Sequence, residues 1–149
     1  MRFLGGATVL RAEAPGVVQR WLGAWRENGI GHLVIERNGR VLGRIGFVVW
    51  DSSTWRQATF AEAGDHAQPE LGWALARAHW GQGYATEAAF AAREWAHRER
   101  HLEPLVSLIA PANDASQRVA HRLGARPSRT VTLASAQAAI VWEHPGDSV

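Results

Sequence analysis

The N-terminal part of the chain changes from a helical to a strand-like pattern of apolar positions. Between residues 13 and 28, apolar side chains recur every three to four positions and form one face of a helix, which Asn28-Gly29 ends. These side chains are Val17, Val18, Trp21, Leu22 and Trp25. Two β-rich runs follow within residues 31–50, joined by Asn38-Gly39, a dipeptide typical of tight hairpins. The pattern therefore predicts a helix followed by two antiparallel strands.

The next segment, residues 51–69, shows no sustained period. It is polar and interrupted by Gly and Pro, which predicts a mobile loop with at most a short strand near residues 58–60. Loops of this length often carry function, so the segment is a candidate side of a binding site.

A strand, a helix and a second strand occupy the middle of the chain. The stretch "ELGWALA" predicts a strand over residues 70–76, and the alanine-rich stretch after it predicts a helix over residues 84–100. Within that helix, Glu94 and Arg98 have the spacing of an ion pair. The apolar run at residues 105–110 predicts the second strand. This order of elements implies a right-handed parallel crossover.

The sequence after residue 110 predicts one more helix and a closing hairpin. The helix runs from about Asp114 to Leu123 and is stopped by Gly124, while residues 129–133 and 138–143 form two weaker strand patterns. All the elements together predict a single domain over residues 1–149. Its fold class is α/β, with helices packed on one mixed sheet.

Composition narrows the functions open to this domain. A chain of 149 residues, 46% hydrophobic and 20% charged, can build one soluble core, and its apolar runs are too short to span a membrane. The absence of cysteine excludes disulfides, thiolate metal sites and an acyl-cysteine intermediate. The 16 basic residues are all Arg and are interleaved with 14 acids, so no basic stripe predicts nucleic-acid binding. No secretory signal is visible at the N-terminus, which predicts a cytoplasmic protein.

Two glycines precede the central helix. Gly81 and Gly83 lie where the first amides of that helix lack intrahelical partners and the helix dipole adds partial positive charge, so a phosphate can bind there. Glycine also permits positive φ and a close approach of backbone to ligand. An isolated Gly-x-Gly is more often only a tight turn before a helix, so at this point both interpretations stand.

The surrounding sequence resembles a known family. The stretch "ELGWALARAHWGQGYATEAAFAAREWA", followed by "IAPANDASQRVAHRLGA", is similar to the GNAT acyltransferase superfamily, most closely to its branch of ribosomal-protein N-terminal acetyltransferase-like (RimJ/RimL-like) enzymes. The similarity covers about residues 70–125. The superfamily motif (Gln or Arg)-x-x-Gly-x-(Gly or Ala) corresponds here to residues 80–85, where Trp80 departs from the general pattern but is usual in the RimJ/RimL-like branch.

The resemblance implies a fold and a coenzyme. It implies a GNAT-like mixed sheet in which the parallel strands 70–76 and 105–110 splay apart, with the pantetheine arm of acetyl-coenzyme A lying between them. The Thr86 hydroxyl and a run of backbone amides would hold the pyrophosphate, and Asn113 would bond the pantetheine. The amides are those of Gly81, Gln82, Gly83, Tyr84 and Ala85. Three residues would offer backbone hydrogen bonds to the same arm: Trp73, Ala74 and Leu75.

The resemblance also implies a catalytic acid. Ser116 matches the serine that RimJ/RimL-like enzymes place near the coenzyme sulfur as a proton donor. The residues themselves leave an alternative open, because Asn113 is a good helix N-cap and Ser116 can simply help to satisfy the first turn. A tyrosine acid found in other superfamily members is excluded, since Ala120 occupies that position.

A catalytic base is harder to assign. The glutamate that RimJ/RimL-like enzymes can use, about twenty residues beyond the serine, has no counterpart in "TVTLASAQAA". Glu70 at the start of the central strand is the best remaining candidate, followed by Glu62, Asp65 and His66. For each of them, a solvated surface residue or a strand-edge charge is the commoner interpretation.

Other residues carry weaker expectations. Trp50 and Trp55, at a strand end and in the loop, are candidate linings of an acceptor groove. His97 and His101 have the spacing of zinc ligands, but no third ligand is near in sequence, so no metal is expected.

The predicted activity follows from the resemblance. It is acetyl-coenzyme A-dependent N-acetylation of a primary amine, either a protein N-terminus or a small amine such as an aminoglycoside or amino acid. Family members begin with a strand and a helix before the segment matching "RFLGG", so the chain is expected to be N-terminally shortened, and a homodimer is one way to cover the exposed edge. The missing base and strand also motivate a second hypothesis, a non-catalytic acyl-coenzyme A-binding or scaffold module.

Overall fold

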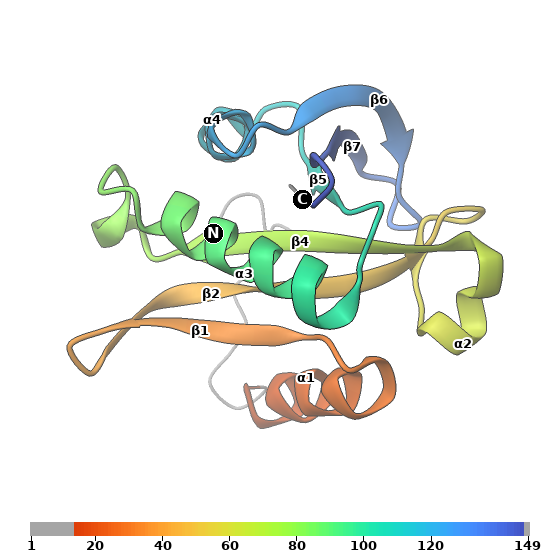
Figure 1. The fold of residues 1–149 in the computed structure, drawn as a ribbon, viewed down its shortest axis with the longest axis horizontal. Helices are drawn as coiled ribbons and strands as arrows, with labels where there is room; N and C mark the ends of the chain where they lie inside the picture. The colour runs from red at the N-terminus through yellow and green to blue at the C-terminus, as the bar shows by residue number, and fades with distance from the viewer. Residues whose placement is uncertain (1–13, 148–149) are drawn as a thin grey trace.

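A seven-stranded mixed sheet with helices on both faces forms the centre of the molecule (Figure 1). The computed structural model describes residues 14–147, so the expected shortening at the N-terminus lies outside the described residues. Along the sheet the order is β1-β2-β4-β5-β7-β6, and β3 pairs with β2 beside this path. The strands are β1 His32–Arg37, β2 Arg40–Asp51, β3 Arg56–Gln57, β4 Ala67–Leu75, β5 Val106–Ile109, β6 Arg126–Thr132 and β7 Ala138–Glu143. The helices are α1 Ala14–Asn28, α2 Phe60–Ala63, α3 Tyr84–Arg100 and α4 Asp114–Arg122.

The first helix and hairpin confirm the sequence-based prediction. Helix α1 ends at Asn28, and β1 and β2 pair in antiparallel register. The turn between them places Asn38 at φ 50° and Gly39 at φ 77°, the left-handed conformations that this dipeptide adopts readily. No helix within residues 14–147 is long and apolar enough to cross a membrane.

The prediction of a loop over residues 51–69 was wrong. This segment contains β3, helix α2, a 3-10 turn at Gly64–His66 and the first residues of β4. The strand expected near residues 58–60 lies at Arg56–Gln57 instead. Helix α2 forms because Thr59 and Glu62 make a reciprocal capping box, whose Thr-x-x-Glu signature is readable in the sequence. Elements this short show no period, so a search for periodicity misses them.

The predicted crossover is present between β4 and β5. Helix α3 spans the predicted residues, and the Arg98 guanidinium lies 3.0 Å from the Glu94 carboxylate. Its buried alanines at positions 89, 92 and 96 pack against Phe47 of β2 and Leu71 of β4. Small side chains on this face let α3 lie close to the sheet, which fixes the distance of its N-terminus from the end of β4.

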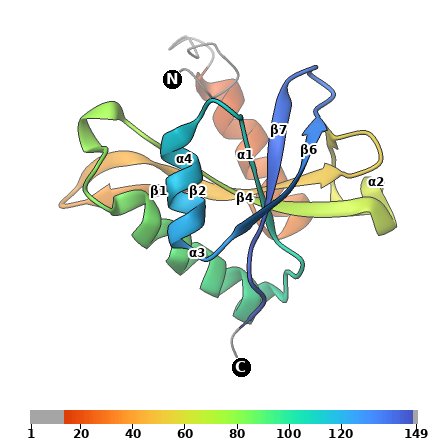
Figure 2. The same cartoon turned by 90° about the horizontal axis from the view of Figure 1, so that it is seen from above.

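The sheet separates two environments. On β2 and β4, side chains such as Phe47 and Leu71 face α3, while Trp50 and Glu70 point to the opposite face and contact each other. Figure 2 shows α1 and α3 on opposite sides of the strands β1, β2 and β4. The face opposite α3 therefore lies on the side of α1, and any group it carries is separated from α3 by the thickness of the sheet.

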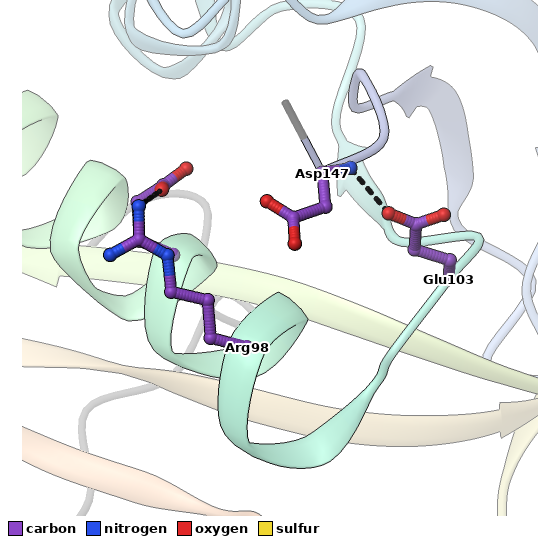
Figure 3. Close-up of polar contacts among 4 residues, drawn as sticks. Arg98, Glu103 and Asp147 are labelled. Atoms are coloured by element: carbon purple, nitrogen blue, oxygen red, sulfur yellow. Dashed lines mark hydrogen bonds and ion pairs between the residues drawn. The ribbon is translucent and has the colours of Figure 1, made fainter. Parts of the chain in front are cut away.

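The C-terminal part also confirms the predicted elements. Helix α4 ends before Gly124, which adopts φ 78°, and β6 and β7 pair as an antiparallel hairpin. Strand β7 continues the sheet beside β5. Beyond it, the amide of Asp147 donates to the carboxylate of Glu103, which follows the end of α3 (Figure 3).

Candidate active site

The parallel strands β4 and β5 part after a single registered pair, Glu70 with Val106. Side chains bridge the strands beside that pair. The Glu70 carboxylate accepts the amide of Leu108 at 3.0 Å, and the Ser107 hydroxyl donates to the Leu71 carbonyl at 2.6 Å. Beyond these bonds β4 has no backbone partner on this side within the described residues. The splayed pair expected from the resemblance is therefore present, with side chains holding its closed end.

A buried polar network supports this closed end. The Ser107 hydroxyl lies 2.8 Å from Nε2 of His144, whose Nδ1 lies 3.2 Å from the Arg93 guanidinium. Because Arg93 only donates, Nδ1 of His144 accepts and Nε2 carries the proton. Burial, together with the positive charge of Arg93, lowers the pKa of His144 to about 4. His144 is therefore neutral at neutral pH and links α3 to the strands at the crevice.

We expect acid to weaken the fold through His144. Its pKa is 6.5 when unperturbed and about 4 in the folded protein, so the unfolded state binds the proton more readily. The contribution of His144 to the free energy of unfolding falls as pH decreases from about 6.5 to 4, by roughly 3 kcal/mol in total. An NMR titration of the histidine resonances should place the His144 midpoint near 4. A midpoint near 6.5 for His144 would contradict the network.

The glycine turn forms an open cradle at the end of the crevice. Gly81 and Gly83 adopt φ 75° and 82°, and a Cβ built on either would meet no atom of the described part of the chain within 4 Å. Gly83 occupies the N-cap position of α3 without a side-chain cap, and the described residues supply no acceptor for the amides from Gly81 to Thr86. The buried Thr86 hydroxyl also has no hydrogen-bond partner among these residues. These unpaired donors at the positive end of a 17-residue helix suit an anion such as a pyrophosphate.

The open edge of β4 faces the crevice at alternate residues. The Leu71 carbonyl points toward β5, so the backbone groups of Trp73 and Leu75 share that direction, whereas the Ala74 carbonyl lies against Gly43 of β2. Trp80 folds back so that its indole N–H donates to the Leu75 carbonyl at 2.9 Å. Trp73 thus offers its backbone N–H and carbonyl to an extended ligand, and Leu75 offers its N–H, because the Leu75 carbonyl already accepts from Trp80. Ala74 directs its carbonyl to the neighbouring strand.

Asn113 and Ser116 have different roles at the first turn of α4. The Asn113 side chain accepts the backbone amide of Ser116 at 3.1 Å, so Asn113 is the cap predicted from its residue type. Within the described residues no hydrogen bond occupies the half-buried hydroxyl of Ser116. Capping therefore uses the amide of Ser116 and leaves its hydroxyl available for another partner.

Glu70 lies between the crevice and the face opposite α3. One carboxylate oxygen accepts the Trp50 indole N–H at 2.9 Å and the other accepts the Leu108 amide at 3.0 Å. Burial raises the pKa of Glu70, while these two hydrogen bonds and the charge of Arg44 act in the opposite direction. A carboxylate with a raised pKa is a better proton acceptor than an exposed one. The position of Glu70 thus suits a general base, and its hydrogen bond to Leu108 also connects β4 to β5.

The other candidates lie elsewhere. Glu62 is used in the cap of α2, and Asp65 and His66 are exposed in the 3-10 turn that follows. Trp55 is 9% exposed and packs with Val106 and Val141, which leaves little of its ring for a ligand. Among the two metal candidates, His97 is buried and His101 is exposed, and residues 14–147 contain no group of three potential ligands arranged for a metal.

Sequence reasoning missed three residues that shape the site. Trp80 was noted only for departing from the motif, Ser107 was hidden in an apolar strand, and Arg44 was an unremarked charge in the hairpin. Residue type alone does not distinguish Arg44 from exposed Arg40 of the same strand. The bonds of Ser107 and Trp80 depend on tertiary contacts that the sequence does not reveal.

Comparison with known proteins points to one family. The family model for the acetyltransferase (GNAT) domain matches residues 1–126. The uncharacterized protein YkkB of Bacillus subtilis is 45% identical over 62 residues, a match that spans 42% of this chain and 36% of that protein. The similar segment is therefore a minority of the relative's length.

Solved structures share the whole arrangement. An acetyltransferase from Agrobacterium tumefaciens is 30% identical and superposes with a TM-score of 0.74, covering 96% of this chain and 76% of that one. An aminoglycoside acetyltransferase in complex with coenzyme A has the same fold at 16% identity, with a TM-score of 0.71 and coverage of 96% and 80%. Solved neighbours also include ribosomal-protein acetyltransferases. The resemblance inferred from residues 70–125 is confirmed at the level of fold and family.

Proposed function

Because this chain belongs to the family of GNAT acetyltransferase domains, we propose that it transfers an acetyl group from acetyl-coenzyme A directly to a primary amine. The observation that carries the proposal is the juxtaposition of a parted strand pair with an open glycine cradle at its end. Unpaired backbone groups along the crevice and unpaired amides at the helix terminus match an extended chain that ends in a pyrophosphate.

The coenzyme would be held by backbone more than by side chains. The pyrophosphate would lie on the amides from Gly81 to Ala85, with the unpartnered Thr86 hydroxyl as an additional donor. Trp73 and Leu75 would pair with the pantetheine arm as a neighbouring strand does, and the Asn113 side chain would lie at its far end. Bound in this way, acetyl-coenzyme A supplies an activated thioester carbonyl.

Two side chains of this domain would move the protons. Glu70 would take a proton from the amine as the new N–C bond forms, and the Ser116 hydroxyl would give a proton to the sulfur as the C–S bond breaks. The hydroxyl then recovers a proton from solvent and Glu70 releases its proton there. The hydrogen bonds from Trp50 and Leu108 fix the Glu70 carboxylate, so that little reorganisation is needed during the reaction.

The test is turnover with a panel of amines. The protein is incubated with acetyl-coenzyme A and free amino acids, short peptides with free N-termini, and aminoglycosides, and release of free thiol is followed. We expect amine-dependent thiol release with at least one acceptor class. Tight coenzyme binding without thiol release from any acceptor would instead support the non-catalytic binding module.

Replacement of Ser116 by alanine separates catalysis from capping. Because the amide of Ser116, and not its hydroxyl, bonds to Asn113, Ser116→Ala should leave the cap intact. We expect kcat to fall by roughly 100-fold, with unchanged affinity for acetyl-coenzyme A. The matched variant Asn113→Ala should instead lower the free energy of unfolding by about 1 kcal/mol. Unchanged kcat in Ser116→Ala would remove the acid role.

A further inference from the structure

A half-buried cation on the sheet face opposite α3 forms no ion pair within residues 14–147. Arg44 of β2 places one guanidinium nitrogen 3.2 Å from Nδ1 of His32, and its guanidinium carbon lies 5.8 Å from the ring centre of Trp21 on α1. No carboxylate of the described residues lies within ion-pair distance. Cations removed from water are normally paired with an anion in direct contact, whereas Glu70 on the same face acts on Arg44 only from beyond ion-pair distance.

His32 does not supply the missing charge. Burial, together with the positive charge of Arg44, lowers the pKa of His32 to about 4, so its imidazole is neutral at neutral pH. Its Nδ1 therefore accepts a hydrogen bond from Arg44 and fixes the direction of the guanidinium. Trp21 and His32, whose ring centres are 4.6 Å apart, enclose the same side chain. Arg44 is thus oriented by neutral groups, and the Glu70 carboxylate on the same face acts on its charge only from beyond ion-pair distance.

The strand register places Arg44 on the same face as Glu70, with an open position between them. Arg44 pairs with Ala74, which lies four positions along β4 from Glu70, about 13 Å in backbone distance. Gly72 lies midway, and a Cβ built on it would meet no atom of residues 14–147 within 4 Å. No positive φ requires glycine at this position. Its missing side chain leaves room over the sheet between a guanidinium and a carboxylate that are both on long side chains.

We propose that Arg44 binds a carboxylate of the acceptor and so selects amines that carry a carboxylate within a few bonds. This inference rests on the proposed acetyl transfer, with the amine at Glu70 and its carboxylate at Arg44 over Gly72. A planar guanidinium is suited to bidentate recognition of a carboxylate. The same fixed cation repels polycationic acceptors, so it also discriminates against aminoglycosides. Free amino acids and peptides that begin with Asp or Glu are acceptors of this kind, because each carries a carboxylate within a few bonds of its primary amine.

Matched acceptor pairs test the selection by turnover. The first pair is a free amino acid and its carboxamide, and the second is a C-terminally amidated peptide that begins with Asp and its Asn counterpart. We expect kcat/KM of the wild type to favour at least one carboxylate acceptor by about tenfold or more. Arg44→Gln should reduce this ratio to near one, and Arg44→Lys should retain part of it. Arg40→Gln, at an exposed position of the same strand, is the matched control and should keep the wild-type ratio.

Equilibrium binding separates the two levels of the proposal. Calorimetric titration of the coenzyme A-loaded protein with each pair should show carboxylate-dependent binding that Arg44→Gln abolishes. Such binding without thiol release would retain the Arg44 site and reject acetyl transfer. Thiol release without carboxylate preference, or a preference that survives in Arg44→Gln, would overturn the role of Arg44 and retain acetyl transfer. Failure of both carboxylate acceptors to bind would also overturn it.

Discussion

Replacement of Gly83 by valine is expected to abolish measurable binding of acetyl-coenzyme A. Gly83 has φ 82° at the start of α3, in a region that a β-branched residue does not adopt without strain, and its Cα faces open space. A valine there either rotates the turn or covers the unpaired amides. We expect the affinity to fall by roughly 100-fold or more, since several hydrogen bonds to a charged group are lost together. Calorimetric titration with acetyl-coenzyme A measures the change.

The hairpin provides a matched control for backbone strain. Gly39 has φ 77° and open space around its Cα, but it lies in the turn between β1 and β2. Gly39→Val should cost a similar 1–3 kcal/mol of stability, about the range for such strain, and should retain coenzyme affinity. Equal loss of affinity in both variants would mean that general destabilisation, and not the cradle, explains the effect.

Replacement of Glu70 by glutamine is expected to lower kcat by roughly 100-fold or more, within the range for loss of a general base. Glutamine keeps the size of the side chain but cannot take a proton. Its NH2 group would face one of the two donors, the Trp50 indole or the Leu108 amide, and could not accept from it. Some stability is therefore also lost. Affinity for acetyl-coenzyme A should not change, because the cradle and the open edge of β4 are intact. Steady-state kinetics and calorimetry on the same preparation separate these quantities.

The pH profile identifies Glu70 more specifically. Burial raises the pKa of Glu70, so kcat/KM of the wild type should rise with pH as this carboxyl loses its proton, at a midpoint above the ordinary 4.5. Trp50→Phe removes a hydrogen bond that lowers the pKa of Glu70, and should move the midpoint to higher pH. If Glu70→Gln retained the wild-type kcat and profile, Glu70 would only space the strands, and solvent would take the proton.

Local patterns were sufficient to predict most of the fold. The Asn38-Gly39 hairpin, the alanine-rich α3 and the caps of α4 depend on residues close in sequence, and each was found where predicted. The family resemblance added the splay of β4 and β5. The capping box at Thr59 was equally local but was overlooked because the segment around it lacks a period.

The interior of the site depends on long-range contacts that a single sequence does not reveal. Ser107 bonds to groups 36 and 37 positions away, at Leu71 and His144, and Arg93 meets His144 across 51 positions. The role of Arg44 depends on the register between β2 and β4. The alternation of side chains along β2 alone would also allow Arg44 to be a solvated arginine. Such contacts depend on the order of strands in the sheet and on the packing of α3 against it.

The central claim is that the crevice between β4 and β5, with the cradle at its end, is the coenzyme site. An NMR titration of the ¹⁵N-labelled protein with acetyl-coenzyme A tests it most directly, because it reports on the amides themselves. We predict that the largest shifts fall on amides of the crevice and cradle, those of Trp73, Leu75, Gly81, Gln82, Gly83 and Tyr84. Saturating shifts confined to other parts of the domain, or no shifts at millimolar coenzyme, would contradict this assignment.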